Sequence, residues 1–244
     1  MRKKIELCMA VLILLAAGIL GRQGAKLVST VKQEPQDDRF QVVIDVGHGG
    51  VDSGKVSADG ILEKDVNLVI AKKLKVLLEQ EDVRVTMTRD SDTGLYREGD
   101  SNKKVADLQN RCALIETIDP DCTVSIHQNS FSSPEVKGAQ VFYYGQSEGG
   151  KQLAKLIQAS LIRRVDPQNH RQAKANESYY LLKRTVSPTV IVECGFLSHP
   201  AEAALLTSDA YQDRLVWAIH MGVMEFLNGA SAETPSEKTS GEKQ

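Results

Sequence analysis

The sequence predicts an α/β domain of three layers, α/β/α, with a twisted, mostly parallel or mixed sheet and helices on both of its faces. Short β-branched apolar segments alternate along the chain with amphipathic segments of ten residues or more, which is the order that βαβ units produce. The length of 244 residues is enough for one such domain with an appendage at each end. The sequence contains no internal repeat that would indicate a repeat architecture instead.

The expected strands are short apolar runs bounded by turn residues, and several are rich in valine and isoleucine, which favour pleated, buried backbone. In chain order they cover residues 41–46, 83–88, 122–126, 138–144, 179–182 and 190–193. The first strand leads into a loop with five glycines, residues 47–60, where the backbone can turn sharply and approach another group closely.

The expected helices are recognised by apolar residues that recur at spacings of three and four. They cover residues 63–80, 102–117, 148–163 and, in one or two pieces, 200–227. These elements place one domain at residues 40–228.

Both ends of the chain differ in composition from this domain. Three basic residues, Arg2 to Lys4, precede an apolar run from Leu7 to Leu20, which is the layout of a signal peptide or a short membrane anchor over residues 1–21. Residues 22–39 are polar and are expected to be a linker, and residues 229–244 are rich in Ser, Glu and Lys and are expected to be disordered. We therefore expect an exported protein, either secreted or membrane-anchored.

Charge and cysteine usage exclude several classes of protein. Basic and acidic residues number 30 and 32 and aromatic residues make up 5%, so the chain has neither the basic patch nor the stacking platform of a nucleic-acid-binding protein. Outside the leader, Cys112, Cys122 and Cys194 are odd in number and no C-x2-C spacing occurs. We expect neither a disulfide framework nor a structural zinc cluster.

A segment in the glycine loop is close to a phosphate-binding loop but departs from it. Residues 49–56 nearly fit G-x-x-x-x-G-K-[ST], yet Val56 stands where a hydroxyl would hold magnesium. Ala58-Asp59-Gly60 then follows where a helix should begin. We therefore reject a nucleotide-binding function.

Four ionisable residues lie at the ends of the expected elements. His48 follows the first strand, Glu63 opens the first long helix, and His127 and Glu193 follow two apolar strands. The carboxyl ends of parallel strands collect at one edge of a sheet, and charged groups there are costly to bury without a partner. A metal ion would compensate all of them together.

Two imidazoles and one carboxylate form the ligand set of a catalytic zinc site, with a second carboxylate left as base. Glu63 lies beside the His48 loop at a helix N-terminus, so it is the better ligand, and Glu193 is the better base. Taken singly, His127 could be a core histidine and Glu63 a helix-terminal charge. Asn129, beside a ligand, is expected to orient substrate or a ligand.

The same residues carry a resemblance to a known family, the zinc-dependent N-acetylmuramoyl-L-alanine amidases of the Amidase_3 type. It spans about residues 41–228 in order. The matching segments are Asp45–Gly50, Glu63–Leu68, Thr88-Arg89, Leu108 with Arg111, Ser125–Asn129 and Val192–Ser198. The compact build and residues 171–174 and 180–183 resemble the spore-cortex, germination-specific members.

The resemblance implies one zinc ion per chain, held by His48, Glu63 and His127, with Glu193 catalytic. It also implies hydrolysis of the amide between the lactyl group of N-acetylmuramic acid and L-alanine of the stem peptide in peptidoglycan, as a step toward muramic-δ-lactam in the spore cortex. The expected substrate is thus a glycan strand with its stem peptide, and a protein partner could supply activation or targeting.

Some residues depart from the family pattern, and two other functions stay open. Val46, Gln128, Ser130 and His199 differ from the usual residues, and Gln128 could alter the surroundings of the metal. A wall-binding protein with a degenerate site, or a hydrolase acting on another substrate such as a peptide, would share this scaffold. The presence of all four chemical residues favours the amidase.

Overall fold

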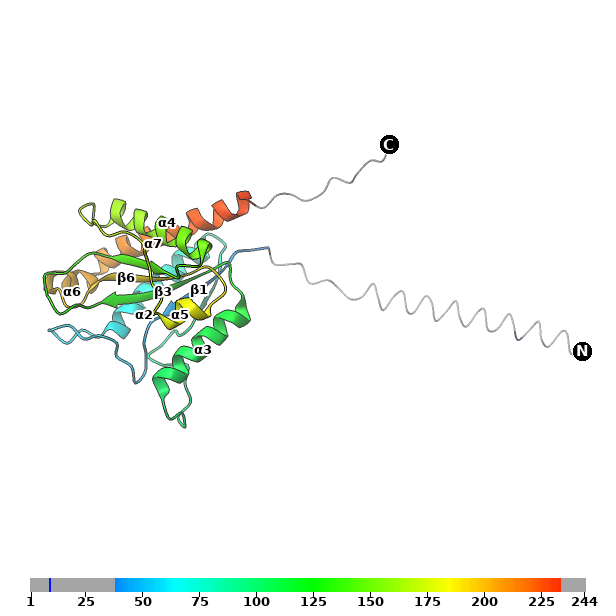
Figure 1. Ribbon diagram of the computed structural model, residues 1–244, viewed down its shortest axis with the longest axis horizontal. Coiled ribbons are helices and arrows are strands. Elements are labelled where there is room, and N and C mark those ends of the chain that lie inside the picture. The colour runs from blue at the N-terminus through cyan, green and yellow to red at the C-terminus, as the bar shows by residue number, and fades with distance from the viewer. Residues whose placement is uncertain (1–8, 10–37, 234–244) are drawn as a thin grey trace, which may run out of the picture. The chain divides into compact units, whose positions relative to one another are not determined.

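The centre of the fold is a six-stranded sheet in the order β2-β1-β3-β6-β4-β5 (Figure 1). The structure is a computed structural model that describes residues 9 and 38–233. Its strands are β1 (Gln41–Val46), β2 (Arg84–Met87), β3 (Cys122–Asn129), β4 (Gln140–Tyr143), β5 (Lys174–Ala175) and β6 (Thr189–Phe196). Only the β4–β6 pair is antiparallel among these strands, so the sheet is mixed, as the sequence predicted.

Helices cover both faces of the sheet, with α4 and α7 above it and α3 and α5 below it in Figure 1. The helices are α2 (Glu63–Gln80), α3 (Lys103–Ile118), α4 (Glu148–Arg164), α5 (Tyr180–Arg184), α6 (Pro200–Leu206) and α7 (Asp209–Glu233). The three-layer prediction is therefore confirmed. Within the described residues, no helix has the length and hydropathy needed to cross a bilayer.

Alternation along β1 assigns its side chains to two different layers. Val42, Ile44 and Val46 join the large core cluster that also contains the buried faces of α2, α4 and α7. Val43 belongs to a smaller cluster with residues of α3 and α5. Because successive side chains of a strand point to opposite faces, Asp45 lies on the α3 side with Val43. The Asp45 carboxylate is therefore on the face of the sheet that α3 covers.

Two strands run further than expected, which changes where the site residues lie. β3 continues through Asn129 and β6 continues through Phe196. His127 and Glu193 therefore lie within strands and not after them, and they face each other as partners in the parallel β3–β6 ladder. A register shift between His127 and Asn129 interrupts the ladder at this point.

Three other features of the local structure differ from the description that the sequence provided. Residues 179–182 were expected to be a strand, but Tyr180–Arg184 form helix α5, whose approach is fixed by the Asn176 side chain accepting hydrogen bonds from the backbone N–H groups of Ser178 and Tyr179. Strand β5 was missed because it has only two residues, both exposed. Helix α7 continues to Glu233, into the expected tail, since no helix breaker follows Gly229 before Pro235.

The leader, almost all of the linker and residues 234–244 of the tail lie outside the described residues. The cysteines at 112, 122 and 194 are buried and unpaired. Burial raises the pKa of the Cys112 thiol to about 11, so these side chains act as small apolar groups.

Candidate metal centre

The loop after β1 holds His48 in a backbone conformation that its sequence alone would not favour. His48 has φ +61°, in the left-handed region that non-glycine residues rarely adopt. Its carbonyl oxygen accepts hydrogen bonds from Arg89 Nε and Arg111 Nη2, both at 2.7 Å. Both guanidinium groups are buried, so the turn is fixed by strong donors from two distant segments.

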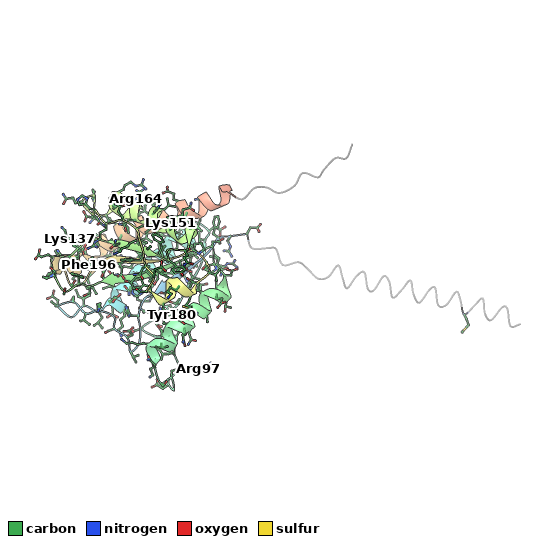
Figure 2. All side chains as sticks on the ribbon, in the orientation of Figure 1. Arg97, Lys137, Lys151, Arg164, Tyr180 and Phe196 are labelled. Carbon is green, nitrogen blue, oxygen red and sulfur yellow. The ribbon has the colours of Figure 1, made fainter. Side chains whose placement is uncertain are left out.

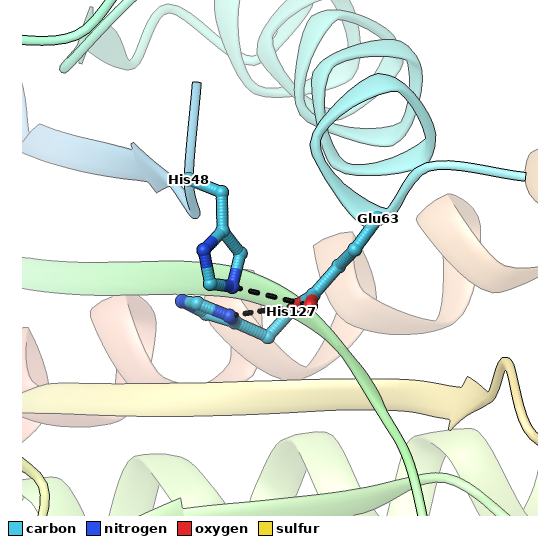
Figure 3. A group of neighbouring side chains, drawn as sticks. All are labelled: His48, Glu63 and His127. Atoms are coloured by element: carbon cyan, nitrogen blue, oxygen red, sulfur yellow. Dashed lines mark hydrogen bonds and ion pairs between the residues drawn. The ribbon is translucent and has the colours of Figure 1, made fainter. Parts of the chain in front are cut away.

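His48, Glu63 and His127 come together at one point, as Figure 3 shows. Glu63 Oε2 lies 3.1 Å from His48 Nε2, and Glu63 Oε1 lies 2.9 Å from His127 Nδ1. One donor atom from each side chain lies within 4.8 Å of the other two. The carboxylate thus stands between the two imidazoles, and a metal ion would find two nitrogens and an oxygen converging on it.

Glu63 is kept ionised at this position although it is only 2% exposed. Burial opposes its charge, but hydrogen bonds with His127 and His48 outweigh burial and hold the pKa of the carboxyl well below its usual range. Two backbone N–H groups, those of Lys55 and Gln128, also donate to it. Its place as the first residue of α2 adds the favourable end of the helix dipole.

Glycines make the space in which these side chains meet. A Cβ at Gly54, which has φ +67°, would lie 2.5 Å from Glu63 Oε2, and a Cβ at Gly47 would lie 2.5 Å from His127 Nε2. Any larger residue at either position would displace one of the three donors. The glycine loop therefore serves the cluster of donors.

Asp52 orients His48 from the side away from Glu63. Its Oδ2 lies 2.8 Å from His48 Nδ1, and its Oδ1 lies 2.7 Å from Lys104 Nζ. Partial burial opposes ionisation, but the hydrogen bonds from Lys104 and His48 lower the pKa of Asp52 to about 2. An ionised Asp52 favours the proton on Nδ1 and leaves Nε2 free to bind a metal ion.

A second network of buried charges lies beneath the site. Asp45 accepts hydrogen bonds from Arg111 Nη1 at 2.8 Å, Ser125 Oγ at 2.5 Å and Thr88 Oγ1 at 3.0 Å. Burial opposes its charge, but the positive charge of Arg111 and the Ser125 hydrogen bond lower the pKa of Asp45. Arg111 therefore joins this buried carboxylate to the carbonyl of His48.

Glu193 lies on β6 beside His127 and is only 6% exposed. Its Oε1 accepts a hydrogen bond from the Tyr179 hydroxyl at 3.3 Å. Burial raises the pKa of Glu193 above its ordinary value, which makes its carboxylate more basic. A buried carboxylate with a raised pKa beside a group of metal-binding side chains has the properties of a general base.

Two cavities, of about 250 and 450 Å³, open beside these side chains. Both are lined by His48, Asp52, Lys104, His127, Tyr179 and Glu193. Leu108, Leu181 and Ile191 give the smaller cavity an apolar wall, whereas Lys55, Asn129 and Ser130 line the larger one. The donor cluster and Glu193 therefore face a cleft with one apolar and one polar side.

The residues flanking His127 behave differently from one another. Asn129 lines the larger cavity, where its Oδ1 accepts a hydrogen bond from the backbone N–H of Ser130. The Gln128 side chain is buried and donates to Asn67 Oδ1, and Asn67 in turn donates to the carbonyl of Gly47. Gln128 thus links α2 to the backbone of the His48 loop.

The remaining histidines lie elsewhere. His199 caps α6, with its Nδ1 accepting from the N–H of Glu202, and His220 is buried on α7. His170 is exposed.

Sequence reasoning missed the roles of Asp52, Lys104 and Tyr179. Asp52 lies in the segment that imitates a phosphate loop, and nothing in its neighbours indicates that it reaches His48. Arg89 and Arg111 were noted as motif residues without a role. A charged side chain beside apolar helix residues was the available signal for Arg111, whereas Arg89 precedes the polar run Asp90-Ser91-Asp92 and gave no such signal.

Comparisons with known proteins agree on one family. The family model described as N-acetylmuramoyl-L-alanine amidase matches residues 42–225. The germination-specific N-acetylmuramoyl-L-alanine amidase of Bacillus subtilis is 38% identical over 189 residues, which cover 76% of this chain and 79% of that protein. The amidase LytC of the same organism is 30% identical over 187 residues, covering 76% of this chain and 35% of LytC.

A solved structure extends the similarity to three dimensions. The CwlD amidase from Clostridioides difficile, in complex with the GerS lipoprotein, matches with a TM-score of 0.76 at 39% identity. The match covers 78% of this chain and all of that one. A second amidase, from Clostridium difficile 630, matches with a TM-score of 0.69 at 32% identity, over 78% of this chain and 97% of that one.

Proposed function

The chain belongs to the N-acetylmuramoyl-L-alanine amidase family, and on that premise we propose that it is a zinc-dependent amidase acting in the spore cortex. The family gives the reaction: hydrolysis of the amide between the lactyl group of N-acetylmuramic acid and L-alanine of the stem peptide. The observation that carries the proposal is the convergence of three metal-binding side chains and the buried Glu193 on one cleft.

The donor set fits zinc. Two imidazole nitrogens and one carboxylate are a common protein ligand set of catalytic zinc, with a further position left for water or substrate. The proposed ligands are His48 through Nε2, His127 through Nδ1, and Glu63, for one ion per chain. When bound, zinc would polarise the scissile carbonyl and make a water molecule more acidic at neutral pH.

Glu193 is the proposed catalytic residue. Its carboxylate takes a proton from the attacking water as the water oxygen bonds to the lactyl carbonyl carbon. The same proton then goes to the L-alanine nitrogen as the carbon–nitrogen bond breaks, leaving a free lactyl carboxyl group and a free amine. Asn129, on the polar side of the cleft, is proposed to orient the substrate.

The place of action rests on the germination-specific relative and on the N-terminal sequence. We propose that residues 1–21 export the protein or anchor it, that residues 22–39 link it to a catalytic domain at residues 40–228, and that it acts outside the cytoplasmic membrane. Removing peptide from muramic acid provides the free lactyl group from which muramic-δ-lactam is made. The Clostridioides difficile relative is complexed with a lipoprotein, so a partner of this kind is proposed for activation or targeting.

The test uses the full-length chain purified in detergent, with cortex peptidoglycan as substrate. We expect about one zinc per chain by elemental analysis, and free lactyl-muramic ends by mass spectrometry of the products. Glu193→Gln should keep zinc and lose turnover, whereas His127→Ala should lose zinc. His170→Ala, at an exposed histidine, is the control and should keep both. Release of other peptide fragments, or zinc retained in full by His127→Ala, would overturn the proposal.

A further inference from the structure

The two oxygens of the Glu193 carboxylate have different surroundings. Oε1 accepts a hydrogen bond from the Tyr179 hydroxyl at 3.3 Å. Oε2 is fully buried and has no hydrogen-bond partner among the described residues. Among the described residues, the Tyr179 hydroxyl therefore supplies the hydrogen bond that holds the Glu193 carboxylate.

Tyr179 is held by contacts of both its ring and its backbone. Its ring packs edge-on against Phe142 of β4, with ring centroids 5.7 Å apart, and its backbone N–H donates to Asn176 Oδ1 at 2.9 Å. The residue directly precedes α5 and lines both cavities of the cleft. The sheet therefore fixes the ring, and the Asn176 turn fixes the backbone.

The neighbouring tyrosine shows that this arrangement is specific. Tyr180, labelled in Figure 2, is 37% exposed, and Arg184 lies over its ring at 5.3 Å from the centroid. Among the described residues, its hydroxyl makes no hydrogen bond with Glu193. Of the two adjacent hydroxyls, that of Tyr179 alone donates to the base.

The Tyr179 hydroxyl keeps its proton over the range in which a hydrolase works. Burial and the nearby negative charge of Glu193 raise the pKa of Tyr179 to about 12. A phenol that stays protonated is a donor to a carboxylate and does not compete with Glu193 for the proton of a water molecule.

We propose that Tyr179 is a positioning residue, whose hydroxyl holds Oε1 of Glu193 and so fixes the orientation of the carboxylate that takes the proton of the attacking water. This inference rests on the proposed role of Glu193 as base. A glutamate has three side-chain torsions, and a base that rotates away from the water must be brought back in every turnover. One hydrogen bond at Oε1 removes the last of these rotations.

The first test compares two tyrosine variants of the full-length chain. Tyr179→Phe removes the hydroxyl and keeps the ring. Tyr144→Phe is a matched control, because Tyr144 packs against the same cluster of Phe142, Leu182 and Ile191 and lines neither cavity. The measurements are kcat and KM on a soluble disaccharide-tripeptide, and zinc per chain.

We expect Tyr179→Phe to lower kcat about tenfold, with KM within about twofold of the wild type and zinc unchanged. Tyr144→Phe should keep kcat within about twofold. A structural role for the hydroxyl would lower both variants alike or change zinc content. Equal kcat values for the two variants, or loss of zinc from Tyr179→Phe, would overturn the inference.

A double-mutant cycle separates this inference from the proposed function. Glu193→Asp shortens the base and withdraws it from Tyr179, so adding Tyr179→Phe should lower kcat by less than about twofold. A full tenfold loss in that background would show that Tyr179 acts independently of Glu193 and would overturn the inference. If Glu193→Gln keeps normal turnover, the proposed base is wrong, and the inference falls with it. If Glu193→Gln is inactive while Tyr179→Phe is normal, only the inference fails.

Discussion

The sheet edge near His48, Glu63 and His127 and the helical layer of α4 and α7 each contain a buried ionisable side chain, Arg111 and His220, and the surroundings of these two side chains differ. At the edge, Arg111 donates to Asp45, to the carbonyls of Val46 and His48, and to further partners. On α7, neither ring nitrogen of the buried His220 has a hydrogen-bond partner within the described residues. Arg111 is held by charges and hydrogen bonds, whereas α7 packs so closely on α4 that Gly222 lies against Ile157. Substitutions should therefore act differently in the two regions.

The largest effect is expected where a buried charge loses its partner. Arg111→Met leaves Asp45 ionised and unpaired in the interior, which should lower the free energy of unfolding by about 3–5 kcal/mol. Chemical denaturation measures this loss. Arg97→Met, at an exposed arginine, should change the free energy of unfolding by less than about 0.5 kcal/mol. If both variants are equally stable, the edge does not depend on this charge network.

The helical layer should respond most strongly to added volume. Gly222 of α7 lies so close to α4 that a Cβ would meet Ile157 Cα at 2.6 Å, whereas a Cβ at Gly229 of the same helix would meet nothing within 4 Å. Gly222→Ala should destabilise the protein by about 2 kcal/mol, because the two helices must move apart. Gly229→Ala should stabilise it by up to about 1 kcal/mol through helix propensity. Thermal denaturation should show a lower melting temperature for Gly222→Ala and a higher one for Gly229→Ala. Equal changes in melting temperature would contradict close packing of α7 on α4 as the main source of stability in this layer.

A smaller effect is expected from the residue that orients His48. Asp52→Asn keeps the shape of the side chain but removes the charge that faces His48 Nδ1. Such partners of metal ligands typically contribute 10–100-fold in metal affinity, and we expect about a tenfold loss of zinc affinity, equal to about 1.4 kcal/mol. Competition with a chelator measures it. Asp59→Asn, at an exposed position of the same loop, is the control, and an affinity loss equal to the control's would exclude the orienting role.

The smallest effect is expected from the unpartnered histidine. Burial lowers the pKa of His220 below its ordinary value of 6.5, so the unfolded chain takes up a proton more readily than the folded chain. Its contribution to stability is therefore complete above about pH 6.5 and decreases as the pH falls below that value. Between pH 7.5 and 5.5, the free energy of unfolding should fall less for His220→Gln than for the wild type. The two decreases should differ by under about 1.4 kcal/mol, the equivalent of one pKa unit.

Denaturation curves at several pH values provide the measurement for His220. His170→Gln, at an exposed histidine, should keep the pH dependence of the wild type. If the free energy of unfolding of His220→Gln changes with pH as it does for the wild type, burial of the His220 ring does not contribute to the pH dependence of stability.

The sequence singled out four ionisable residues that the structure gathers at one cleft, but it did not locate the ends of the strands that carry two of them, His127 and Glu193. An acidic or imidazole side chain at the end of an apolar run is visible in the sequence, because it contradicts its surroundings. The true ends of β3 and β6 are not visible, since Gln128, Asn129 and Gly195 continue their strands only through pairing with a neighbouring strand. Strand ends depend on a partner that the local sequence does not contain.

Helix α5 shows why a short element was assigned wrongly. Leu181 packs in the cluster with Val43 and Cys112, whereas Leu182 packs in the cluster with Phe142 and Ile191. Because these two adjacent apolar residues pack in different clusters, the five-residue segment shows neither the hydrophobic period of a helix nor that of a strand. Packing between α3 and the sheet selects the helix.

The sequence by itself determined the layers and the types of side chain that the cleft gathers, because hydrophobic period and residue type are local properties. The contacts that orient the chemistry needed the tertiary structure. The Arg111–Asp45 contact spans 66 residues and the His127–Glu63 contact spans 64. Tyr179 meets Glu193 only because α5 packs beside β6. Hydrogen bonds act over about 3 Å, and no local pattern specifies which distant donor will come that close.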